Sequence, residues 1–304
     1  MTETSKALVS VIIASYNHRH LIERTLISLF AQDYRPLEVL VIDDGSTDGS
    51  GDFLETLQGR YDFRLIRRAN GGVVSVINLG IRESRGDYVL IHASDDESLP
   101  GRLSGQVAVL ERHPEAAFVS GNVAFVTEDG QRRGNLLEDT GAEREYGFEE
   151  LFLERVVASS VACLYRGADL RAMTPLDERY LAEDLQMFLY LTRSGRRWVQ
   201  WSGPPVILYR LLFSSLSRTK LPRLLRQRLA ALEEFADHPL YPRAVAQVRT
   251  ALVSALAEQD KPAALRELGA GRIEVFSVGF LRVLAKLALP RRWHHRFKKE
   301  GRSA

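Results

Sequence analysis

The chain has 304 residues, of which 45% are hydrophobic, and its formal net charge is +2. This length and composition are enough to bury one large core or two modest ones, which argues against a disordered chain. The single cysteine, Cys163, cannot form an internal disulfide, and the lack of a Cys/His cluster excludes a zinc site, so we expect any metal on oxygen ligands.

The first residues lead into an apolar stretch without the hydrophobic region of a secretory signal. No segment reaches the ~20 apolar residues that a membrane-spanning helix needs. Even the most apolar late segment, residues 275–289, is interrupted by Arg282 and Lys286. We therefore expect a cytoplasmic protein that does not span a membrane.

Apolar runs and amphipathic segments alternate along the N-terminal part of the chain. Residues 8–14 and 37–43 are rich in Val and Ile, as in parallel strands that are covered on both faces. Between them, residues 18–32 carry apolar side chains at helical spacing, and Asn17 is the predicted N-cap. The pattern continues with a helix over 51–58, a strand over 63–67, a helix over 73–84 and a strand over 88–92. This order predicts a doubly wound, mostly parallel sheet with right-handed crossovers.

In sheets of this kind, ligands bind beyond the carboxyl ends of the strands. Three of the predicted strands end in polar sequence, at residues 15–17, 43–46 and 94–97. We expect these three segments to converge on one crevice that carries the chemistry.

The remainder of the chain is less regular. A helix is predicted over 102–112 and a strand over 117–120, whereas the polar stretch 127–145 indicates a surface loop or lid. Helical spacing returns over residues 148–154 and 181–194, and it dominates from Leu221 onward, where prolines punctuate the sequence.

Adjacent aspartates follow two of the predicted strands. Asp95 and Asp96 supply hard carboxylate oxygens, which Mg²⁺ or Mn²⁺ binds while keeping positions open for phosphate oxygens. Taken alone, this pair could equally cap the helix that follows Pro100. Asp43 and Asp44 precede a Gly/Ser-rich run suited to a tight turn, and alone they indicate only that turn.

Four motifs occur in order: SVIIASYN at 10–17, VIDDGSTDGS at 41–50, NGG at 70–72 and GDYVLIHASDD at 86–96. In this combination the chain resembles the family 2 glycosyltransferases, which have the GT-A fold. The resemblance is strong over residues 8–120 and moderate over 164–217. It implies inverting transfer of a sugar from a nucleoside-diphosphate sugar, such as a UDP- or dTDP-sugar, to an acceptor hydroxyl. Synthesis of cell-envelope or extracellular polysaccharides or glycoconjugates is the expected setting.

The resemblance also implies roles for single residues. Tyr16, with Asp43 or Asp44, would hold the base and ribose, whereas Asp95 and Asp96 would bind a divalent cation, Mg²⁺ or Mn²⁺, and the donor diphosphate. The candidate donor-binding residues are Ser15, Tyr16, Asn17, Asp43, Asp44, Asn70, Gly71, Gly72, Asn78, Asp95 and Arg210, and the candidate metal ligands are Asp95 and Asp96.

Glu183 and Asp184 resemble the family's Glu-Asp segment, in which the aspartate is the general base. On that basis Asp184 is the candidate catalytic residue. Successive helix positions differ by about 100°, so one of the two carboxylates can face the acceptor while the other bonds the scaffold. A solvated acidic helix start is the alternative. Apolar Leu185 and Phe188 favour a helix that packs on the core.

Two features depart from the family pattern. The histidine that relatives often carry after Tyr209-Arg210 is absent, and Ala93 stands where many relatives have an extra aspartate. Both changes leave fewer metal ligands, which puts strict metal dependence in question. Arg210 and Ser215 could contact the diphosphate instead, or Arg210 could pair with a carboxylate.

Other classes of protein fit the sequence less well. A nicotinamide dehydrogenase needs GxGxxG in the first turn and a P-loop NTPase needs GxxxxGK[ST], and the chain contains neither motif. A non-catalytic sugar-nucleotide-binding or scaffold protein with a decayed site is the alternative left open. Nucleic acid is not an expected partner, because the front half is acidic and no aromatic-basic RNA motif occurs.

Charge divides the chain into two regions. Residues 1–217 carry 23 Lys and Arg against 31 Asp and Glu, whereas residues 218–304 carry 18 against 8. We expect a glycosyltransferase domain over 1–217, with a donor half over about 8–120 and an acceptor half over 121–217, and a basic helical region over 218–304. Apolar residues 273–289 and basic residues 290–299 suggest an anchor on the anionic cytoplasmic face of a membrane, which suits a lipid-linked or saccharide acceptor. Docking of this tail on the acidic domain is the alternative.

Overall fold

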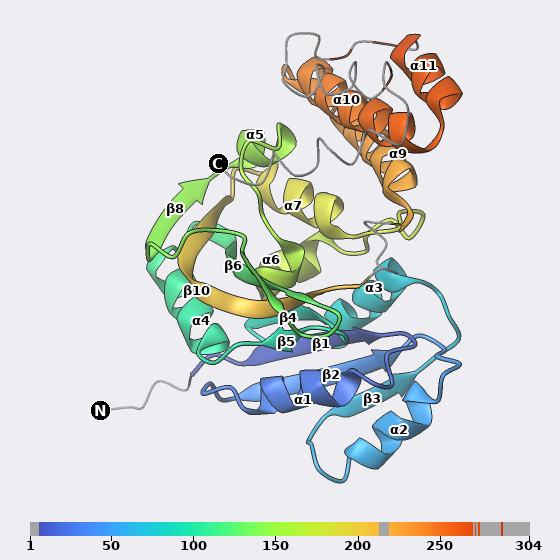
Figure 1. Cartoon of the computed structure of the whole chain (residues 1–304). Helices are drawn as coiled ribbons and strands as arrows, with labels where there is room; N and C mark the ends of the chain where they lie inside the picture. Colours follow the sequence, from blue (N-terminus) through green and yellow to red (C-terminus); the bar gives the residue numbers. More distant parts are fainter. Residues whose placement is uncertain (1–5, 213–218, 270, 272, 274–286, 288–304) are drawn as a thin grey trace. The chain divides into compact units, whose positions relative to one another are not determined.

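The computed structural model describes residues 6–212, 219–269, 271, 273 and 287. The chain divides into two compact units, one that ends at Leu212 and one that begins at Phe213 (Figure 1). The boundary predicted after residue 217 falls in a segment outside the described residues.

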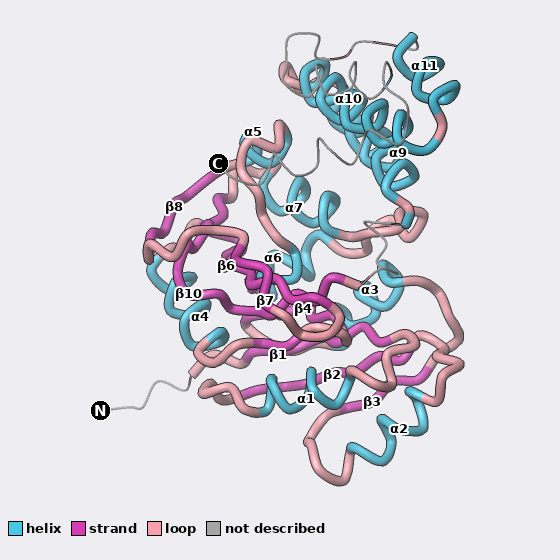
Figure 2. Tube along the Cα trace, viewed as in Figure 1, coloured by secondary structure: helices cyan, strands magenta, loops and turns pink. Residues whose placement is uncertain are grey.

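A ten-stranded mixed sheet forms the centre of the first unit, and Figure 2 shows its strands in magenta. The order is β3-β2-β1-β4-β9-β6-β10-β5, with β7 paired to β6 and β8 paired to β10. The strands are β1 Val9–Ser15, β2 Leu37–Asp43, β3 Arg64–Arg67, β4 Tyr88–Ala93, β5 Glu97–Ser98, β6 Ala116–Thr127, β7 Arg132–Asn135, β8 Ala142–Tyr146, β9 Cys163–Arg166 and β10 Arg197–Leu211.

Helices connect and cover these strands. They are α1 Ile22–Phe30, α2 Ser50–Leu57, α3 Val73–Glu83, α4 Arg102–Arg112, α5 Phe148–Phe152, α6 Gly167–Met173 and α7 Asp184–Thr192, with a 3₁₀ turn η1 at Ser160–Ala162. The predicted β-α-β-α-β order of the N-terminal part is thus confirmed.

The four strands β3, β2, β1 and β4 are parallel to one another. Beyond them β9 runs antiparallel to both β4 and β6, whereas β6 and β10 are parallel to each other. The predicted parallel sheet is therefore confirmed for the donor half, and the wider sheet is mixed. In this register Ser15 lies opposite Asp43, and Ala14 lies opposite Ala93, so the polar strand ends meet at one edge.

The core explains why the sheet and helices hold this arrangement. Apolar residues of β1 are fully buried on both faces of the sheet. On one side, Val11 and Ile13 belong to a cluster that includes Leu26 and other side chains of α1 and α4. On the other side α3 lies very close to β1, because a methyl group at Gly80 would come within 2.3 Å of Ile12. This close approach fixes α3 and thereby the loop that precedes it.

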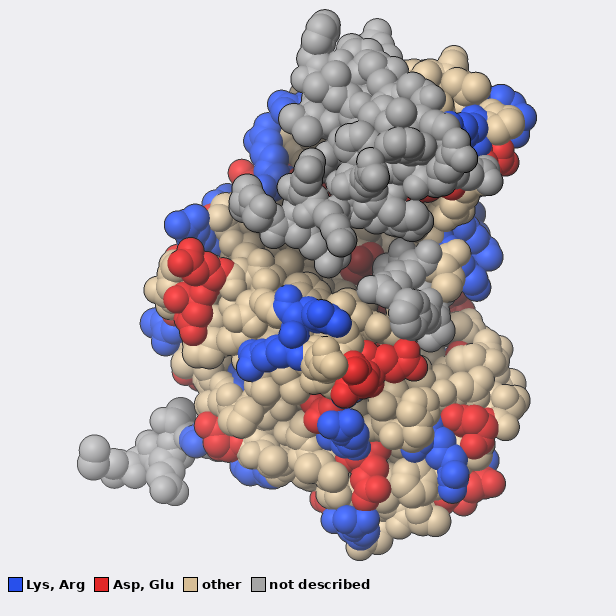
Figure 3. Space-filling view, in the orientation of Figure 1, with Lys and Arg blue, Asp and Glu red and all other residues tan. Residues whose placement is uncertain are grey.

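Charged side chains of both signs are interspersed on the face of the first unit seen in Figure 3. Several form ion pairs between neighbouring elements, such as Arg60 with Glu23 at 2.6 Å and Arg64 with Glu83 at 2.7 Å. The arginines of these pairs are more than half exposed. Exposed pairs contribute about 0.2–1 kcal/mol each, so the stability of this unit comes mainly from its core.

The predicted start of the first helix and its predicted N-cap were wrong. Helix α1 begins at Ile22, not at His18, and Leu21 precedes it without a side-chain cap. Asn17 does not cap the helix, because its backbone is left-handed with φ 56°. Its side-chain oxygen accepts a hydrogen bond from the amide of Thr47 instead. A polar residue before an amphipathic run was therefore mistaken for a helix start.

The predicted surface loop over residues 127–145 was also wrong in part. It contains β7, which pairs with β6, and β8, which pairs with β10. The long strand β10 was missed, because Gly203, Pro204 and Pro205 suggest a break in any strand. The structure accommodates these residues with shifts of register between Gln200 and Ile207.

A cluster of charged side chains fastens β8 to the end of α4. His113 Nδ1 lies 2.6 Å from Glu145 Oε1, and its Nε2 lies 2.8 Å from Glu143 Oε2. Arg112 also bonds Glu143. Burial alone would lower the pKa of His113, but the bonds with Glu145 and Glu143 outweigh it and raise the pKa.

Replacing His113 with Phe is therefore expected to destabilise the protein more at low pH than at high pH. The stabilisation from a raised histidine pKa is complete below the unfolded pKa and disappears as the pH rises through the folded pKa. For a partly exposed cluster we expect about 1 kcal/mol at pH 6 and less at pH 9. Urea unfolding at both pH values measures the difference. An equal loss at both would show that packing, rather than charge, is responsible.

The second unit is helical in its described part, as predicted. It contains α9 Leu221–Leu232, a 3₁₀ turn η2 at Glu233–Phe235, α10 Tyr241–Gln259 and α11 Lys261–Gly269. Arg249 of α10 forms an ion pair with Glu267 of α11 at 3.3 Å. No helix among the described residues combines the length and apolar character needed to cross a membrane. The proposed anchor over 273–299 lies almost entirely outside the described residues.

Candidate active site

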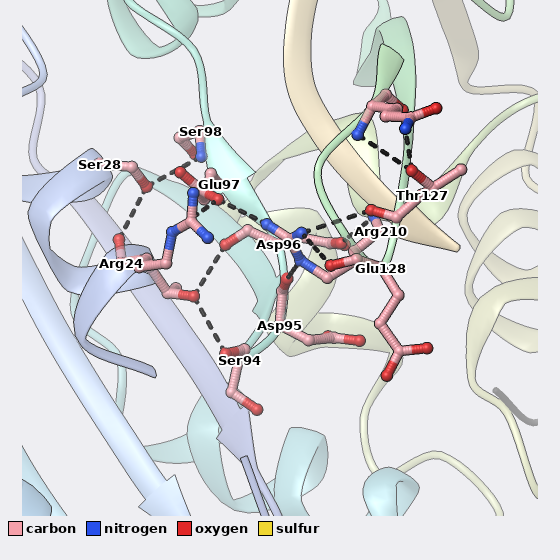
Figure 4. A network of polar contacts seen from close by, with 12 residues as sticks. Arg24, Ser28, Ser94, Asp95, Asp96, Glu97, Ser98, Thr127, Glu128 and Arg210 are labelled. Carbon is pink, nitrogen blue, oxygen red and sulfur yellow. Dashed lines mark hydrogen bonds and ion pairs between the residues drawn. The ribbon is translucent and has the colours of Figure 1, made fainter. Parts of the chain in front are cut away.

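The polar loops that follow β1, β2 and β4 meet at one edge of the sheet, together with the end of β10. Figure 4 shows the part of this region around Asp95 and Asp96. The convergence predicted from the sequence follows from the register of the parallel strands.

Asp96 is the most deeply buried acidic group of the site, with 1% of its surface exposed. Its Oδ1 accepts a hydrogen bond of 2.9 Å from the backbone amide of Arg210. Its Oδ2 is also buried and has no hydrogen-bond partner within the described part of the chain. Burial, and then the charge of half-buried Asp95, raise the pKa of Asp96 well above its ordinary value. A buried carboxylate oxygen without a donor is costly unless a cation or other ligand binds it.

Helix α1 holds the backbone of this loop in place. Thr25 Oγ1 donates to the carbonyl oxygens of Ser94 and Asp96, at 3.0 and 2.8 Å. His18 Nδ1 lies 2.8 Å from Ser94 Oγ, which joins the loop after β1 to the loop after β4. The Ser94–Asp96 segment is therefore anchored through its carbonyl groups, and Oδ2 of Asp96 stays without a partner among the described residues.

A buried polar cluster lies next to this loop, and no motif in the sequence indicates it. Arg102 is 1% exposed, and its Nη1 and Nη2 donate to Ser98 Oγ and to the carbonyl of Val161. His92 Nε2 lies 3.0 Å from the same Ser98 hydroxyl. Burial, and then the positive charge of Arg102, lower the pKa of His92 to about 3, so His92 is neutral. Burial lowers the pKa of Arg102 to about 10, and it remains a buried cation near Asp96.

The end of β1 and the loop after it carry a buried hydroxyl group and an exposed ring. Tyr16 is 46% exposed, whereas Ser15 is buried and its hydroxyl oxygen has no hydrogen-bond partner among the described residues. The amide of Asn17 donates to Ser46 Oγ at 2.9 Å, and Asn17 Oδ1 accepts from Thr47. Asn17 thus ties the two loops together, and Tyr16 is left free for a planar ligand.

The two aspartates after β2 have different environments. Asp44 accepts the backbone amides of Gly71 and Gly72, at 2.9 and 2.8 Å, one on each carboxylate oxygen. Asp43 Oδ2 accepts the amide of Ser46 at 3.3 Å, whereas its buried Oδ1 has no partner within the described residues. The sequence left Asp43 and Asp44 as equal candidates. In the structure, Asp43 keeps a buried oxygen without a partner among the described residues, whereas Asp44 shapes the exposed Asn70–Gly72 loop.

Asn78 of α3 is buried, and its amide bonds the chain itself. Its Nδ2 donates to the carbonyl of Leu176 at 2.9 Å and to Glu178 Oε1 at 3.1 Å. Its Oδ1 accepts the amide of Leu176 at 2.8 Å. Asn78 therefore links the donor half to the segment that leads to Glu183 and Asp184.

The two carboxylates at the start of α7 also differ. Asp184 is exposed, whereas Glu183 is half-buried. Burial, and then the charge of Asp184, raise the pKa of Glu183 to about 7. Helix α7 is held by Phe188, which stacks on Phe118 with ring centroids 5.1 Å apart. The difference between neighbours on a helix was expected from the sequence, but only the structure shows which of them is exposed.

Arg210 is 3% exposed and pairs with Glu97 at 2.7 Å. Of the two roles that the sequence left open for Arg210, the structure shows the pairing with a carboxylate. No group of three or more His, Cys, Asp or Glu residues suited to a metal ion occurs in the part of the chain that the structure describes. Any metal here would therefore take few protein ligands, which agrees with Ala93 and the absent histidine.

Comparisons with known proteins show which family the chain belongs to. Residues 10–172 match the glycosyl transferase family 2. The putative glycosyltransferase EpsE of Bacillus subtilis is 30% identical over 132 residues, covering 42% of this chain and 48% of EpsE. The UDP-Glc:alpha-D-GlcNAc-diphosphoundecaprenol beta-1,3-glucosyltransferase WfaP of Escherichia coli is 26% identical over 223 residues, covering 72% of this chain and 84% of WfaP. The chain thus spans less than half the length of some of its curated relatives, including EpsE.

Among solved structures, residues 1–349 of TarS of S. aureus in complex with UDP-GlcNAc align with a TM-score of 0.65. The alignment covers 96% of this chain and 91% of that one at 16% identity, which shows a shared fold. The predicted GT-A fold with a helical C-terminal region is confirmed. From the family match over more than half of its length, the chain belongs to the glycosyl transferase family 2.

Proposed function

We propose that this protein transfers a sugar from a nucleoside-diphosphate sugar to an acceptor hydroxyl, with inversion at the anomeric carbon. The observation that carries the proposal is the buried Asp96 carboxylate at the convergent strand ends, whose Oδ2 has no hydrogen-bond partner among the described residues. Membership of the family supports the reaction class. A UDP-sugar is the preferred donor, since the related fold of TarS was solved with UDP-GlcNAc.

The nucleoside would bind between the loops that follow β1 and β2. The exposed ring of Tyr16 offers a stacking surface for the base. Oδ1 of Asp43, which has no partner among the described residues, can accept a hydrogen bond from the base or ribose. The amides of Gly71 and Gly72 hold their loop through Asp44, so this loop can border the sugar. The roles of Tyr16 and Asp43 are thus proposed from an exposed ring and an oxygen without a hydrogen-bond partner among the described residues.

The residues present fit a divalent cation, Mg²⁺ or Mn²⁺, at Asp95 and Asp96. The fit rests on the orphaned buried Oδ2 of Asp96 and on two adjacent carboxylates, which are hard oxygen donors. When bound, such a cation supplies Lewis-acid stabilisation of the departing diphosphate. Asp95 and Asp96 would hold it, and phosphate oxygens and water would complete its coordination.

Asp184 is the proposed general base. Its exposed carboxylate can accept the proton of an acceptor hydroxyl as that oxygen attacks the anomeric carbon. Attack from the face opposite the diphosphate inverts the configuration. Glu183, whose pKa is about 7, is held against the core and is largely neutral below that pH.

The acceptor is proposed to be a saccharide or a lipid-linked saccharide. The name of WfaP gives a GlcNAc linked to diphosphoundecaprenol as its substrate. Because the match covers 72% of this chain and 84% of WfaP, it supports a lipid-linked acceptor for this protein too. A location at the cytoplasmic face of a membrane, with the basic tail on anionic lipid, would bring the enzyme to such an acceptor. Sedimentation of the full-length protein with anionic vesicles at low salt, and its loss after deletion of 273–304, tests that location.

Replacing Asp44 with Ala is expected to weaken donor binding without unfolding the protein. The change removes both acceptors that hold the amides of Gly71 and Gly72, so this loop is free to move. Loss of two charge-assisted bonds that only shape a loop should raise the donor KM by about tenfold. Asp48→Ala is the matched control, since Asp48 accepts the amides of Arg19 and Ser50. Equal effects of both substitutions would refute a specific role for Asp44.

The function is tested by a donor screen. Purified protein is incubated with a panel of nucleotide sugars, with and without Mn²⁺ or Mg²⁺, and release of nucleoside diphosphate is followed. We expect release from one donor, increased by the cation and abolished in Asp96→Asn. No release from any donor, with or without a panel of saccharide and lipid-linked acceptors, would favour a protein that binds sugar nucleotides without catalysis.

A further inference from the structure

The guanidinium group of Arg210 is enclosed by the protein at the edge of the candidate active site. Only 3% of this side chain is exposed. Its Nη2 donates to Glu97 Oε1 at 2.7 Å, and its Nε donates to the carbonyl of Asp95 at 3.3 Å. Its Nη1 lies 3.2 Å from the carbonyl of Glu128 and 3.5 Å from that of Thr127. All three nitrogens are thus engaged by the chain, which leaves little of the group for a ligand (Figure 4).

These contacts join segments that are far apart in the sequence. Arg210 belongs to β10, Asp95 lies in the loop after β4, and Glu97 begins β5. Thr127 and Glu128 lie where β6 turns toward β7. The backbone amide of Arg210 also donates to Asp96 Oδ1. A single residue therefore fixes the carbonyl of Asp95 through its side chain and the carboxylate of Asp96 through its backbone.

Glu97 is the acidic partner of this arrangement. Its Oε1 accepts from Arg210 and also lies 3.3 Å from Nε of Arg24 on α1. The two arginines differ in exposure, because Arg24 is 58% exposed and Arg210 is 3% exposed. An ion pair between solvent-exposed groups contributes little, whereas removal of one partner of a buried pair leaves an uncompensated charge. The contact of Glu97 with Arg210 should therefore matter far more than its contact with Arg24.

We propose that Arg210 and Glu97 are positioning residues, whose ion pair holds the Asp95–Asp96 loop against β10 and the β6–β7 turn. The pair presents the two aspartate carboxylates together toward the donor diphosphate, and Arg210 does not itself bind that diphosphate. This inference rests on the proposed function. The planar fork of arginine is needed, since it reaches a carboxylate and three carbonyl oxygens at once, and a lysine ammonium cannot.

The test compares Arg210→Met, Arg210→Lys, Glu97→Gln and the double variant Arg210→Met/Glu97→Gln with the wild-type chain. Arg24→Met is the matched control, because it removes the exposed partner of the same carboxylate. Three quantities are measured: hydrogen exchange of peptides that cover 94–99 and 127–131, binding of Mn²⁺ in the presence of UDP by electron paramagnetic resonance, and kcat/KM. Circular dichroism verifies folding, and Glu97→Gln, which keeps the size of the side chain, carries the test if Arg210→Met does not fold.

We expect faster exchange of both peptides in Arg210→Met and Glu97→Gln, with Mn²⁺ affinity about tenfold weaker and kcat/KM about 10- to 100-fold lower. Arg210→Lys should not restore the wild-type values, and Arg24→Met should stay within about threefold of them. Because the two residues act as a unit, the double variant should lose at most about threefold more than the worse single variant.

The outcomes that would overturn the positioning role differ from the outcome that would overturn the proposed function. If Arg210→Met loses activity while Glu97→Gln keeps it, or if the two losses are additive, Arg210 acts on the diphosphate directly and the positioning role is overturned. Unchanged exchange at 94–99 in every variant would also overturn it. If the wild-type chain binds no Mn²⁺ with UDP although exchange changes as expected, the proposed function fails, and with it the purpose of the pair.

Discussion

Replacing Asp96 with Asn is expected to reduce sugar transfer by about 10³-fold or more, because the variant loses one of the two carboxylates that we propose as ligands of a divalent cation. The amide oxygen can still accept the bond from the amide of Arg210, so the local backbone should be retained. Activity is measured as nucleoside diphosphate release at saturating donor and Mn²⁺. Turnover equal to that of the wild type would remove Asp96 from the donor site.

The same substitution should leave stability intact or increase it above neutral pH. Burial and Asp95 raise the pKa of Asp96, so the folded protein holds this proton more tightly than the unfolded chain does. The stability of the wild type therefore falls as the pH rises from the unfolded pKa through the raised folded pKa, and asparagine removes this dependence. Urea unfolding of both proteins at pH 5 and pH 8 measures the effect.

Half-buried Asp95 serves as a comparison in the activity assay, and we expect a milder loss of activity in Asp95→Ala than in the Asp96 variant.

The second large effect is expected at the start of α7, where Asp184→Asn should lower kcat by about 10²- to 10⁴-fold, the range typical of a lost general base. Binding of UDP and Mn²⁺ should not change, since the amide keeps the shape of the carboxylate. Calorimetric titration of UDP and steady-state kinetics separate the two effects. A parallel loss of UDP affinity would assign Asp184 to donor binding or to structure.

Glu183→Gln is the matched control for Asp184→Asn, and its effect should depend on pH. Burial and Asp184 raise the pKa of Glu183 to about 7, so at pH 6 this carboxyl is mostly protonated and glutamine resembles it. We expect the variant to keep activity within about threefold at pH 6 and to differ more from the wild type above pH 8. A large loss at pH 6, together with an active Asp184→Asn, would reverse the roles of the two residues.

The sequence alone predicted the elements whose pattern is local. The strands β1 and β2 are Val/Ile-rich, and α4 has clear helical spacing, so their bounds were found to within one residue. The meeting of the polar strand ends was also predictable, because parallel strands place residues that follow them, such as Asp44 and Asp95, at the same edge of the sheet.

The parts that were missed depend on contacts between distant residues. Strand β10 contains Gly203 and Pro204, which by themselves indicate a break, and it forms by pairing with β6. No local pattern distinguishes Asp43 from Asp44, because the difference lies in the amides of Gly71 and Gly72 more than twenty residues away. The pairing of Arg210 with Glu97 spans a still longer separation.

The exposure of Asp184 and the elevated pKa of Glu183 arise from how α7 packs on the sheet. Phe188 stacks on Phe118, and this contact sets which side of the first helical turn faces the core. The helix pattern in the sequence indicated a buried face, but it could not indicate which of the adjacent residues Glu183 and Asp184 would be exposed.

The central claim is that Asp95 and Asp96 hold the donor diphosphate through a divalent cation. The most direct measurement is an anomalous-difference map from crystals of the full chain grown with UDP and Mn²⁺. We predict a single strong peak about 2.1 Å from Oδ2 of Asp96, with the diphosphate of UDP on its far side. A well-ordered UDP with no peak beside Asp95 or Asp96, or with its diphosphate bound away from this loop, would contradict the claim.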